Sequence, residues 1–142
     1  SSKEPKLSLV WIKGDALNTG LPSNSFDGVV MAYGLRNLSD LKAGFKELRR
    51  VLKPGARAGI LDFNNISSES KAAHFQKFYL RNIVVPIAAK FDLRDHYVYL
   101  EESLKCFPQG HEQEDLAREA GFVEAQHHLL AFSQMGTLLL RK

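Results

Sequence analysis

The chain has 142 residues, of which 44% are hydrophobic and 25% are charged, and these proportions are typical of one globular domain with a real core. A formal net charge of +3 is compatible with a place near anionic lipid, but without a stripe of lysines and arginines it does not indicate nucleic-acid binding. The single cysteine, Cys106, excludes an internal disulfide and a metal site built from cysteines. No apolar run approaches the roughly 18 residues of a membrane-spanning helix.

Segments typical of strands and of helices alternate along the first half of the chain. Leu7–Ile12 is a short apolar run that predicts a buried strand. Phe26–Tyr33 predicts a second strand, after the turn residues Pro22–Ser25. Ser39 can cap a helix with apolar residues at helical spacing, and Pro54-Gly55 ends that helix.

The middle of the chain predicts another strand and a long helix. Arg57–Phe63 is an apolar segment that predicts a third buried strand. Ser67 or Ser68 can then cap a helical stretch to about Lys90, interrupted at Pro86.

The end of the chain predicts a short helix and a hairpin. Glu112–Ala120 predicts a helix, with Gly121 as the residue after its C-cap. Phe122–Ala131 and Met135–Leu140 predict two strands joined by a tight turn. Apolar strands that alternate with helices indicate an α/β fold with a parallel sheet, to which the hairpin adds an antiparallel edge. We therefore expect residues 1–142 to form a single domain.

Two short stretches follow the first two predicted strands at the edge where such sheets bind ligands. They are "KGDAL", residues 13–17, and "AYGLRN", residues 32–37. Gly34 lets a ligand approach closely, and Arg36 and Asn37 supply hydrogen-bond donors. On spacing alone, a Gly-Asp turn and an Arg-Asn pair before a capped helix are more often structural than catalytic.

A resemblance to a known family extends these observations. Together, "GDAL", "LPSNSFDGVVMAYGLRNLSD" and "ELRRVLKPGARAGILDF" resemble the ubiquinone/menaquinone-type quinone C-methyltransferases, which are class I enzymes dependent on S-adenosylmethionine. The likeness continues through "YVYLEESLKCFP" and "AGFVEAQHH" and so covers nearly the whole chain. "ILDFNN", "NIVVP" and "SQMGTLLLRK" are most similar to the plant and cyanobacterial branch, which methylates demethylphylloquinone. This branch implies a chloroplast or a cyanobacterial cytoplasm, close to a membrane.

The chain departs from the family at its start. Family members begin with a strand, a Gly-rich loop and an acidic residue that hold the cofactor, but no G-x-G-x-x-G occurs in this chain. We expect a Rossmann-like sheet that lacks the first two strands and this loop. In the family these strands lie between the strand of Trp11 and the strand of Val29. Their absence predicts unpaired edges and a homo-oligomer, with strand exchange as one route to it.

The resemblance implies a cofactor site for S-adenosylmethionine. Asp15 would accept a hydrogen bond from the adenine amino group, and Ala16 would supply a backbone contact beside it. Ala32, Tyr33 and Gly34 would lie along the cofactor near its sulfonium centre.

The resemblance also implies a catalytic pair at the ring of a prenylated quinol. Arg36 and Asn37 would stabilise the phenolate that forms when a ring hydroxyl loses its proton, so that the neighbouring ring carbon can attack the methyl group. Residues 75–85 carry a wide apolar stripe that is typical of a core-facing helix; in the family part of it is a lid over the prenyl tail, near a membrane surface. We expect no metal, since His127 and His128 would face opposite sides of a strand. A non-catalytic domain that acts through association stays open as an alternative.

Overall fold

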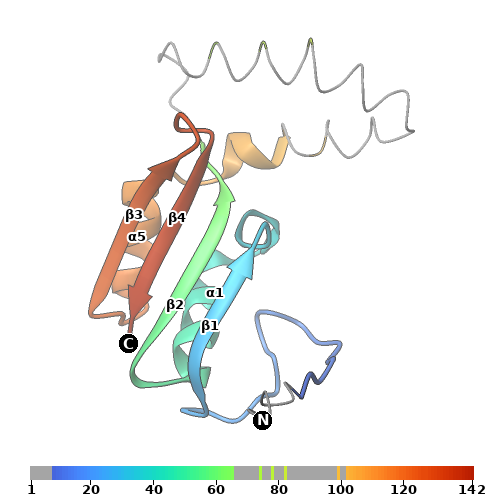
Figure 1. The fold of residues 1–142 in the computed structure, drawn as a ribbon, viewed down its shortest axis with the longest axis vertical. Coiled ribbons are helices and arrows are strands. Elements are labelled where there is room, and N and C mark those ends of the chain that lie inside the picture. Colours follow the sequence, from blue (N-terminus) through green and yellow to red (C-terminus); the bar gives the residue numbers. More distant parts are fainter. Residues whose placement is uncertain (1–7, 66–73, 75–77, 79–81, 83–98, 100–101) are drawn as a thin grey trace, which may run out of the picture.

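The structure is a computed structural model that describes residues 8–65, 74, 78, 82, 99 and 102–142. The predicted helix from Ser67 or Ser68 to Lys90 therefore lies almost wholly outside the described residues. In chain order the elements are β1 (Phe26–Ala32), the 3-10 helix η1 (Leu35–Asn37), α1 (Leu41–Val51), β2 (Leu52–Phe63), α5 (Gly110–Glu119), β3 (Glu124–Leu130) and β4 (Met135–Arg141) (Figure 1).

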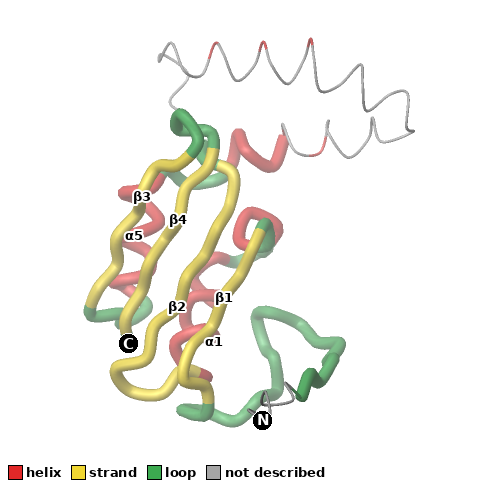
Figure 2. Tube along the Cα trace, in the orientation of Figure 1, coloured by secondary structure: helices red, strands yellow, loops and turns green. Residues whose placement is uncertain are grey.

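The described strands form one mixed sheet in the order β1-β2-β4-β3. β1 is parallel to β2, β4 is antiparallel to β2, and β3 is antiparallel to β4. The second strand of the hairpin thus lies inside the sheet and the first strand forms its outer edge. Figure 2 shows α1 and α5 on one face of this sheet. This arrangement confirms the predicted α/β class with an antiparallel hairpin.

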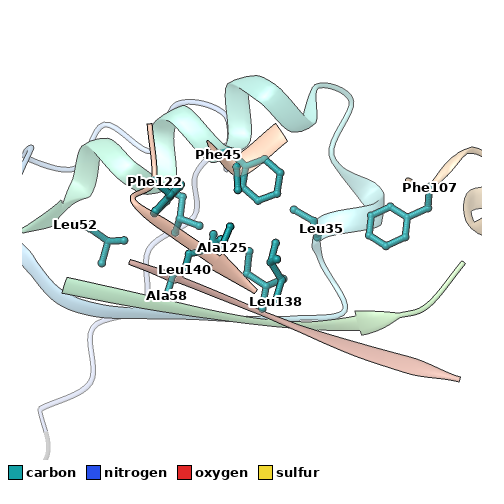
Figure 3. Packing of buried hydrophobic residues seen from close by; sticks show 12 residues of the cluster. Leu35, Phe45, Leu52, Ala58, Phe107, Phe122, Ala125, Leu138 and Leu140 are labelled. Atoms are coloured by element: carbon teal, nitrogen blue, oxygen red, sulfur yellow. The ribbon is translucent and has the colours of Figure 1, made fainter. Parts of the chain in front are cut away.

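The hydrophobic core fills the space between the sheet and the two helices (Figure 3). Alternate residues of β2 and β4 face the helices, among them Ile60 and Leu138, which pair with each other in register. Phe45 of α1 and Phe122 after α5 pack from the helical side. Each fully buried side chain of this kind stabilises the fold by about 1.5–3 kcal/mol. The core therefore holds in place the carboxyl ends of β1 and β2, next to which the candidate site lies.

The ends of α1 differ from the prediction by one or a few residues. Asp40, and not Ser39, is its N-cap, and the Asp40 carboxylate accepts a hydrogen bond of 2.9 Å from the N–H of Ala43. A carboxylate at this position satisfies a free N–H and also interacts favourably with the helix dipole. The helix ends at Val51, before Pro54, because Leu52 already begins β2.

The predicted end of the short helix α5 is confirmed. Ala120 is its C-cap, and Gly121 follows with a φ of +101°, a conformation that favours glycine. The N–H of Gly121 donates to the carbonyl of Arg118, and the N–H of Phe122 donates to that of Ala117. These two bonds satisfy carbonyls at the helix end and direct the chain into β3.

The predicted strand Leu7–Ile12 is wrong for the residues that the structure describes. Residues 8–14 form no strand, and Trp11 is 92% exposed. A strand needs a neighbour to satisfy its backbone hydrogen bonds. Among the described strands none pairs with this segment, and the outer edge of β1 has no partner either. The apolar character of residues 8–12 was therefore not enough to make them a strand, because no described strand lies beside them.

Candidate functional site

The candidate site begins where β1 ends and the chain turns into η1. Tyr33 has a φ of +57°, which is uncommon for a residue other than glycine, and its N–H donates to the carbonyl of Leu61 at 2.8 Å. Gly34 follows, where an added Cβ would approach the Cγ of Met31 to 3.2 Å. A side chain at position 34 would therefore press against Met31. The turn leaves Ala32 and Tyr33 exposed at the strand end.

Arg36 forms a buried ion pair with Asp62 at the end of β2. Its Nη1 donates to Oδ1 of Asp62 at 2.6 Å, and the two side chains are only 12% and 5% exposed. The backbone N–H groups of Arg36 and Phe63 also donate to the Asp62 carboxylate. The guanidinium carbon lies 5.2 Å from the centre of the Phe63 ring. Parallel pairing of β1 and β2 thus holds the guanidinium in one place.

One nitrogen of this guanidinium is unusual. The Nε atom of Arg36 is buried and has no hydrogen-bond partner within the described part of the chain. A buried donor without a partner costs about 1–3 kcal/mol, so that a ligand or water that bonds it would be stabilised. Arg36 therefore combines a structural contact with an unused donor.

Asn37 holds the same turn from the other side. Its Nδ2 donates to the carbonyl of Tyr33 at 3.1 Å, and Nη1 of Arg36 donates to that same carbonyl at 3.2 Å. The hydroxyl of Tyr99 donates to Oδ1 of Asn37 at 3.1 Å. The side chains of the predicted Arg-Asn pair therefore meet at the carbonyl of Tyr33, and both help to hold the backbone at the end of β1.

The other predicted stretch forms a turn that approaches the first. Asp15 and Ala16 are exposed, and Oδ1 of Asp15 accepts a hydrogen bond of 2.9 Å from the N–H of Leu17. A Cβ on Gly44 of α1 would lie 3.6 Å from the Leu17 side chain and 2.5 Å from that of Leu38. Since Leu38 directly follows Asn37 in the sequence, the two stretches meet on the same turn of α1.

A buried carboxylate anchors this loop to α1. Oε1 of Glu47 accepts hydrogen bonds from the N–H and the hydroxyl of Thr19 at 2.8 and 2.6 Å. The Arg50 guanidinium bonds both carboxylate oxygens of Glu47. These contacts, with that of Arg50 the largest, lower the pKa of Glu47 from 4.5 to about 2. Glu47 is therefore ionised at neutral pH and fixes the loop that carries Asp15.

A hollow of about 700 Å³ opens beside Arg36 and Asn37. The start of α1, residues 102–107 and α5 all contribute to its lining, which includes Tyr99, Phe107 and Leu116. Its lining combines hydrogen-bonding side chains with apolar ones, which suits an amphipathic ligand that has a polar ring and a hydrocarbon tail. Asp62 and Tyr99 were not predicted as site residues; the only signal for Asp62 was a carboxylate at the end of an apolar strand.

The described histidines do not form a metal site. His127 lies between Gly110 and Gly136, where a Cβ on either glycine would clash with its ring, and burial lowers its pKa. His128 is exposed. Among the described residues no group of three or more histidine, cysteine or carboxylate side chains could hold a metal ion, and no helix could cross a membrane.

The sequence matches known methyltransferases. The family described as the ubiE/COQ5 methyltransferase family matches residues 2–138. The chain is 44% identical over 138 residues to the 2-phytyl-1,4-naphtoquinone methyltransferase of Nostoc punctiforme, with 97% of the chain and 60% of that protein covered. It is 44% identical over 129 residues to the chloroplastic 2-phytyl-1,4-beta-naphthoquinone methyltransferase of Arabidopsis thaliana, with 91% of the chain and 49% of that protein covered. The chain thus spans about half to 60% of these relatives.

Solved structures support the fold. A SAM-dependent methyltransferase from Aquifex aeolicus superposes with a TM-score of 0.57 at 17% identity, and 92% of this chain and 53% of that chain are covered. A SAM-dependent methyltransferase from Archaeoglobus fulgidus gives a TM-score of 0.60 at 12% identity, with 92% and 66% covered. These neighbours confirm the predicted Rossmann-like class I fold, and the sequence match confirms the predicted family. The chain belongs to the ubiE/COQ5 methyltransferase family.

Proposed function

We propose that this chain is part of an S-adenosylmethionine-dependent enzyme that methylates a ring carbon of a prenylated quinol, of the demethylphylloquinone type, in quinone biosynthesis. The names of the cyanobacterial and plant relatives support this substrate class, and they support a chloroplast or a cyanobacterial cell as the location. We also propose a place peripheral to a membrane, because a prenylated quinol partitions into lipid. The observation that carries the proposal is the fixed Arg36–Asn37 edge beside a hollow of about 700 Å³.

The residues of the two turns fit the proposed cofactor. Asp15 keeps an exposed carboxylate, which can accept a hydrogen bond from an adenine amino group beside Ala16. Ala32, Tyr33 and Gly34 leave an accessible strand end along which the cofactor would lie. S-adenosylmethionine would supply the methyl group there. The 142 residues contain no Gly-rich loop, so that these turns would form only one side of the cofactor site.

The proposed chemistry gives Arg36 and Asn37 different tasks. An arginine stays protonated, so Arg36 would not act as the base but would stabilise the negative charge of the ring oxygen. Asp62 would position the guanidinium, since it binds Nη1 and leaves Nε without a partner in the described chain. Asn37, which is exposed and bonded to Tyr99, would orient the ring hydroxyl in the hollow.

The test is methyl transfer to a demethylated naphthoquinol by a protein that contains this chain together with a Gly-rich cofactor loop. Asn37→Ala should lower kcat by about 10²–10³, because the ring hydroxyl would lose the side chain that orients it beside Arg36. A thermal melt of the same protein checks that the turn held by the Asn37 side chain has not unfolded. Asp27→Asn is the control, since Asp27 lies at the opposite end of β1 in an exposed ion pair with Lys53. An Asn37→Ala protein that methylates at the parent's rate would refute the proposed role.

A second role, association with another copy of the chain, is favoured by a different observation. β1 lies at the edge of the described sheet, and the apolar residues 9–12 are exposed beside no described strand. Such edges pair readily with other chains. We therefore propose a homo-oligomer, with strand exchange as one way to form it. Sedimentation velocity should then give a dimer or larger species, and a monomer at every concentration would overturn this role.

A further inference from the structure

The hairpin that joins β3 to β4 ends in an exposed apolar tip, which we define as residues 129–132. Phe132 is 95% exposed, and Leu129 and Leu130 are 57% and 43% exposed. The sequence from Leu129 through Leu140 contains no ionisable side chain. The hairpin tip therefore presents hydrocarbon, and the nearest ionisable side chain in the sequence is that of His128, directly before it on β3.

The backbone holds this tip in an unusual conformation. Ala131, Phe132 and Ser133 have φ values of 50°, 55° and 68°, so three consecutive residues other than glycine are left-handed. This conformation is unfavourable for residues with a side chain and is found where the surrounding structure enforces it.

A buried side chain at the end of β2 enforces it here. Asn64, which is 6% exposed, donates from Nδ2 to the carbonyl of Ser133 at 3.0 Å. The N–H of Asn64 donates to the carbonyl of Gln134 at 2.9 Å. The base of the hairpin tip is thus clamped to the sheet, and the exposure of Phe132 is a built feature of the fold.

The hairpin tip lies at the same edge of the sheet as the candidate site. β4 runs antiparallel to β2, so its start, Met135, pairs with Phe63 at the carboxyl end of β2 (Figure 1). The hydroxyl of Tyr33 donates to the sulfur of Met135 at 3.4 Å. Tyr33 and Phe63 are also in ring contact, with centroids 5.3 Å apart. A surface that received the hairpin tip would therefore lie next to Tyr33 and Arg36.

We propose that the hairpin tip inserts into the surface of a lipid bilayer and sets the candidate site against it. A convex tip of four residues offers far less area than the roughly 1,200–2,000 Å² of a stable protein interface, whereas a bilayer accepts single apolar side chains. The net charge of +3 complements anionic headgroups. That the membrane also delivers the substrate rests on the proposed function, because a quinol with a hydrocarbon tail partitions into lipid.

The chain offers a direct probe, because Trp11 is its only tryptophan. In a Trp11→Phe background, Phe132→Trp places a fluorophore on the hairpin tip. Val123→Trp is the matched control, since Val123 is 65% exposed just before β3, at the opposite end of the same strand. Each protein is mixed with vesicles of phosphatidylcholine and phosphatidylglycerol, with and without brominated lipid. We expect a blue shift and quenching for the tryptophan at position 132 and neither for that at position 123.

Equal responses at the two positions would overturn the proposal. So would a blue emission at position 132 before vesicles are added, because protein would then cover the hairpin tip. In the parent chain, Phe132→Asp should lower vesicle partitioning about tenfold to a hundredfold, as expected for losing one buried aromatic side chain, and Val123→Asp should not. Neither readout needs methyl transfer. A protein that transfers no methyl group but binds vesicles through the hairpin tip would refute the proposed function alone. A protein that transfers methyl groups and whose vesicle binding is unchanged by Phe132→Asp would refute only this inference.

Discussion

Replacing Arg36 by alanine tests how much of the candidate site is also structural. The change leaves the Asp62 carboxylate buried without its ion-pair partner, and breaking such a pair usually costs about 3–5 kcal/mol. Asp62 keeps hydrogen bonds from the backbone N–H groups of residues 36 and 63, so we expect a smaller loss of about 2–4 kcal/mol. A single domain is stable by only about 5–15 kcal/mol, and the melting temperature should fall by about 5–15 °C.

Thermal and urea unfolding, followed by circular dichroism, measure this loss. Lys42→Ala is the control, because Lys42 and Glu119 form an ion pair of 2.7 Å whose side chains are 52% and 56% exposed, and its removal should not change stability measurably. A double variant with Arg36→Ala and Asp62→Asn should lose less than the sum of the two single changes, since both remove one interaction. Arg36→Ala that unfolds like the parent, or strict additivity of the two changes, would refute the role of this ion pair.

Three further results are expected. The pKa of Glu47 is lowered from 4.5 to about 2 in the folded chain, so the ionised carboxylate should stabilise the fold by about 1–2 kcal/mol after discounting for solvent screening. This stabilisation should be present above pH 4.5 and lost as the pH falls toward 2. The urea midpoint of the parent chain should therefore fall over this pH range, and that of Glu47→Gln should fall less. Gly136→Ala should lower the free energy of unfolding by about 1–3 kcal/mol, because its Cβ would lie 2.1 Å from the ring of His127, which Gly110 confines from the other side. Gly59→Ala, whose nearest contact is at 3.9 Å, is the control for that measurement. Calorimetric titration of the 142-residue chain with S-adenosylmethionine should show no micromolar binding, because the chain lacks the Gly-rich loop.

The parts of the fold that were predictable are those that local chemistry decides. The strand at β1, the hairpin of β3 and β4 and the C-terminal glycine of α5 all follow from apolar runs and from turn residues. The segment predicted as a strand at residues 7–12 has the same apolar character, but its described residues 8–12 form no strand, because pairing depends on a neighbour that no local pattern specifies. The N-cap differed for a smaller reason: Ser39 and Asp40 are both good caps, and only the backbone geometry decides between them.

The candidate site shows the same division. That Arg36 and Asn37 lie at a strand end could be predicted from the order of strand, glycine and polar residues. Their partners could not, because Asp62 and Tyr99 are 26 and 62 residues away in the sequence and reach the pair only through the fold. The contact with Asp62 depends on the register of β1 against β2, which is set by the packing of the whole sheet. The contact with Tyr99 depends on the packing of a residue that lies on no strand.

The ion pair also bears on how Arg36 can take part in chemistry. A guanidinium that is neutralised by a buried carboxylate presents less net positive charge to a ligand than a free one, but it is held rigidly and loses little entropy when it forms a further hydrogen bond. Its Nε, buried and without a partner among the described residues, is the donor that gains most from a new acceptor. The exposed Asn37 amide, fixed by Tyr33 and Tyr99, is the more accessible group beside the hollow. In the proposed reaction, stabilisation of a ring oxyanion would therefore depend on the fixed geometry of Arg36 as well as on its charge, and Asp62 is the residue that maintains this geometry.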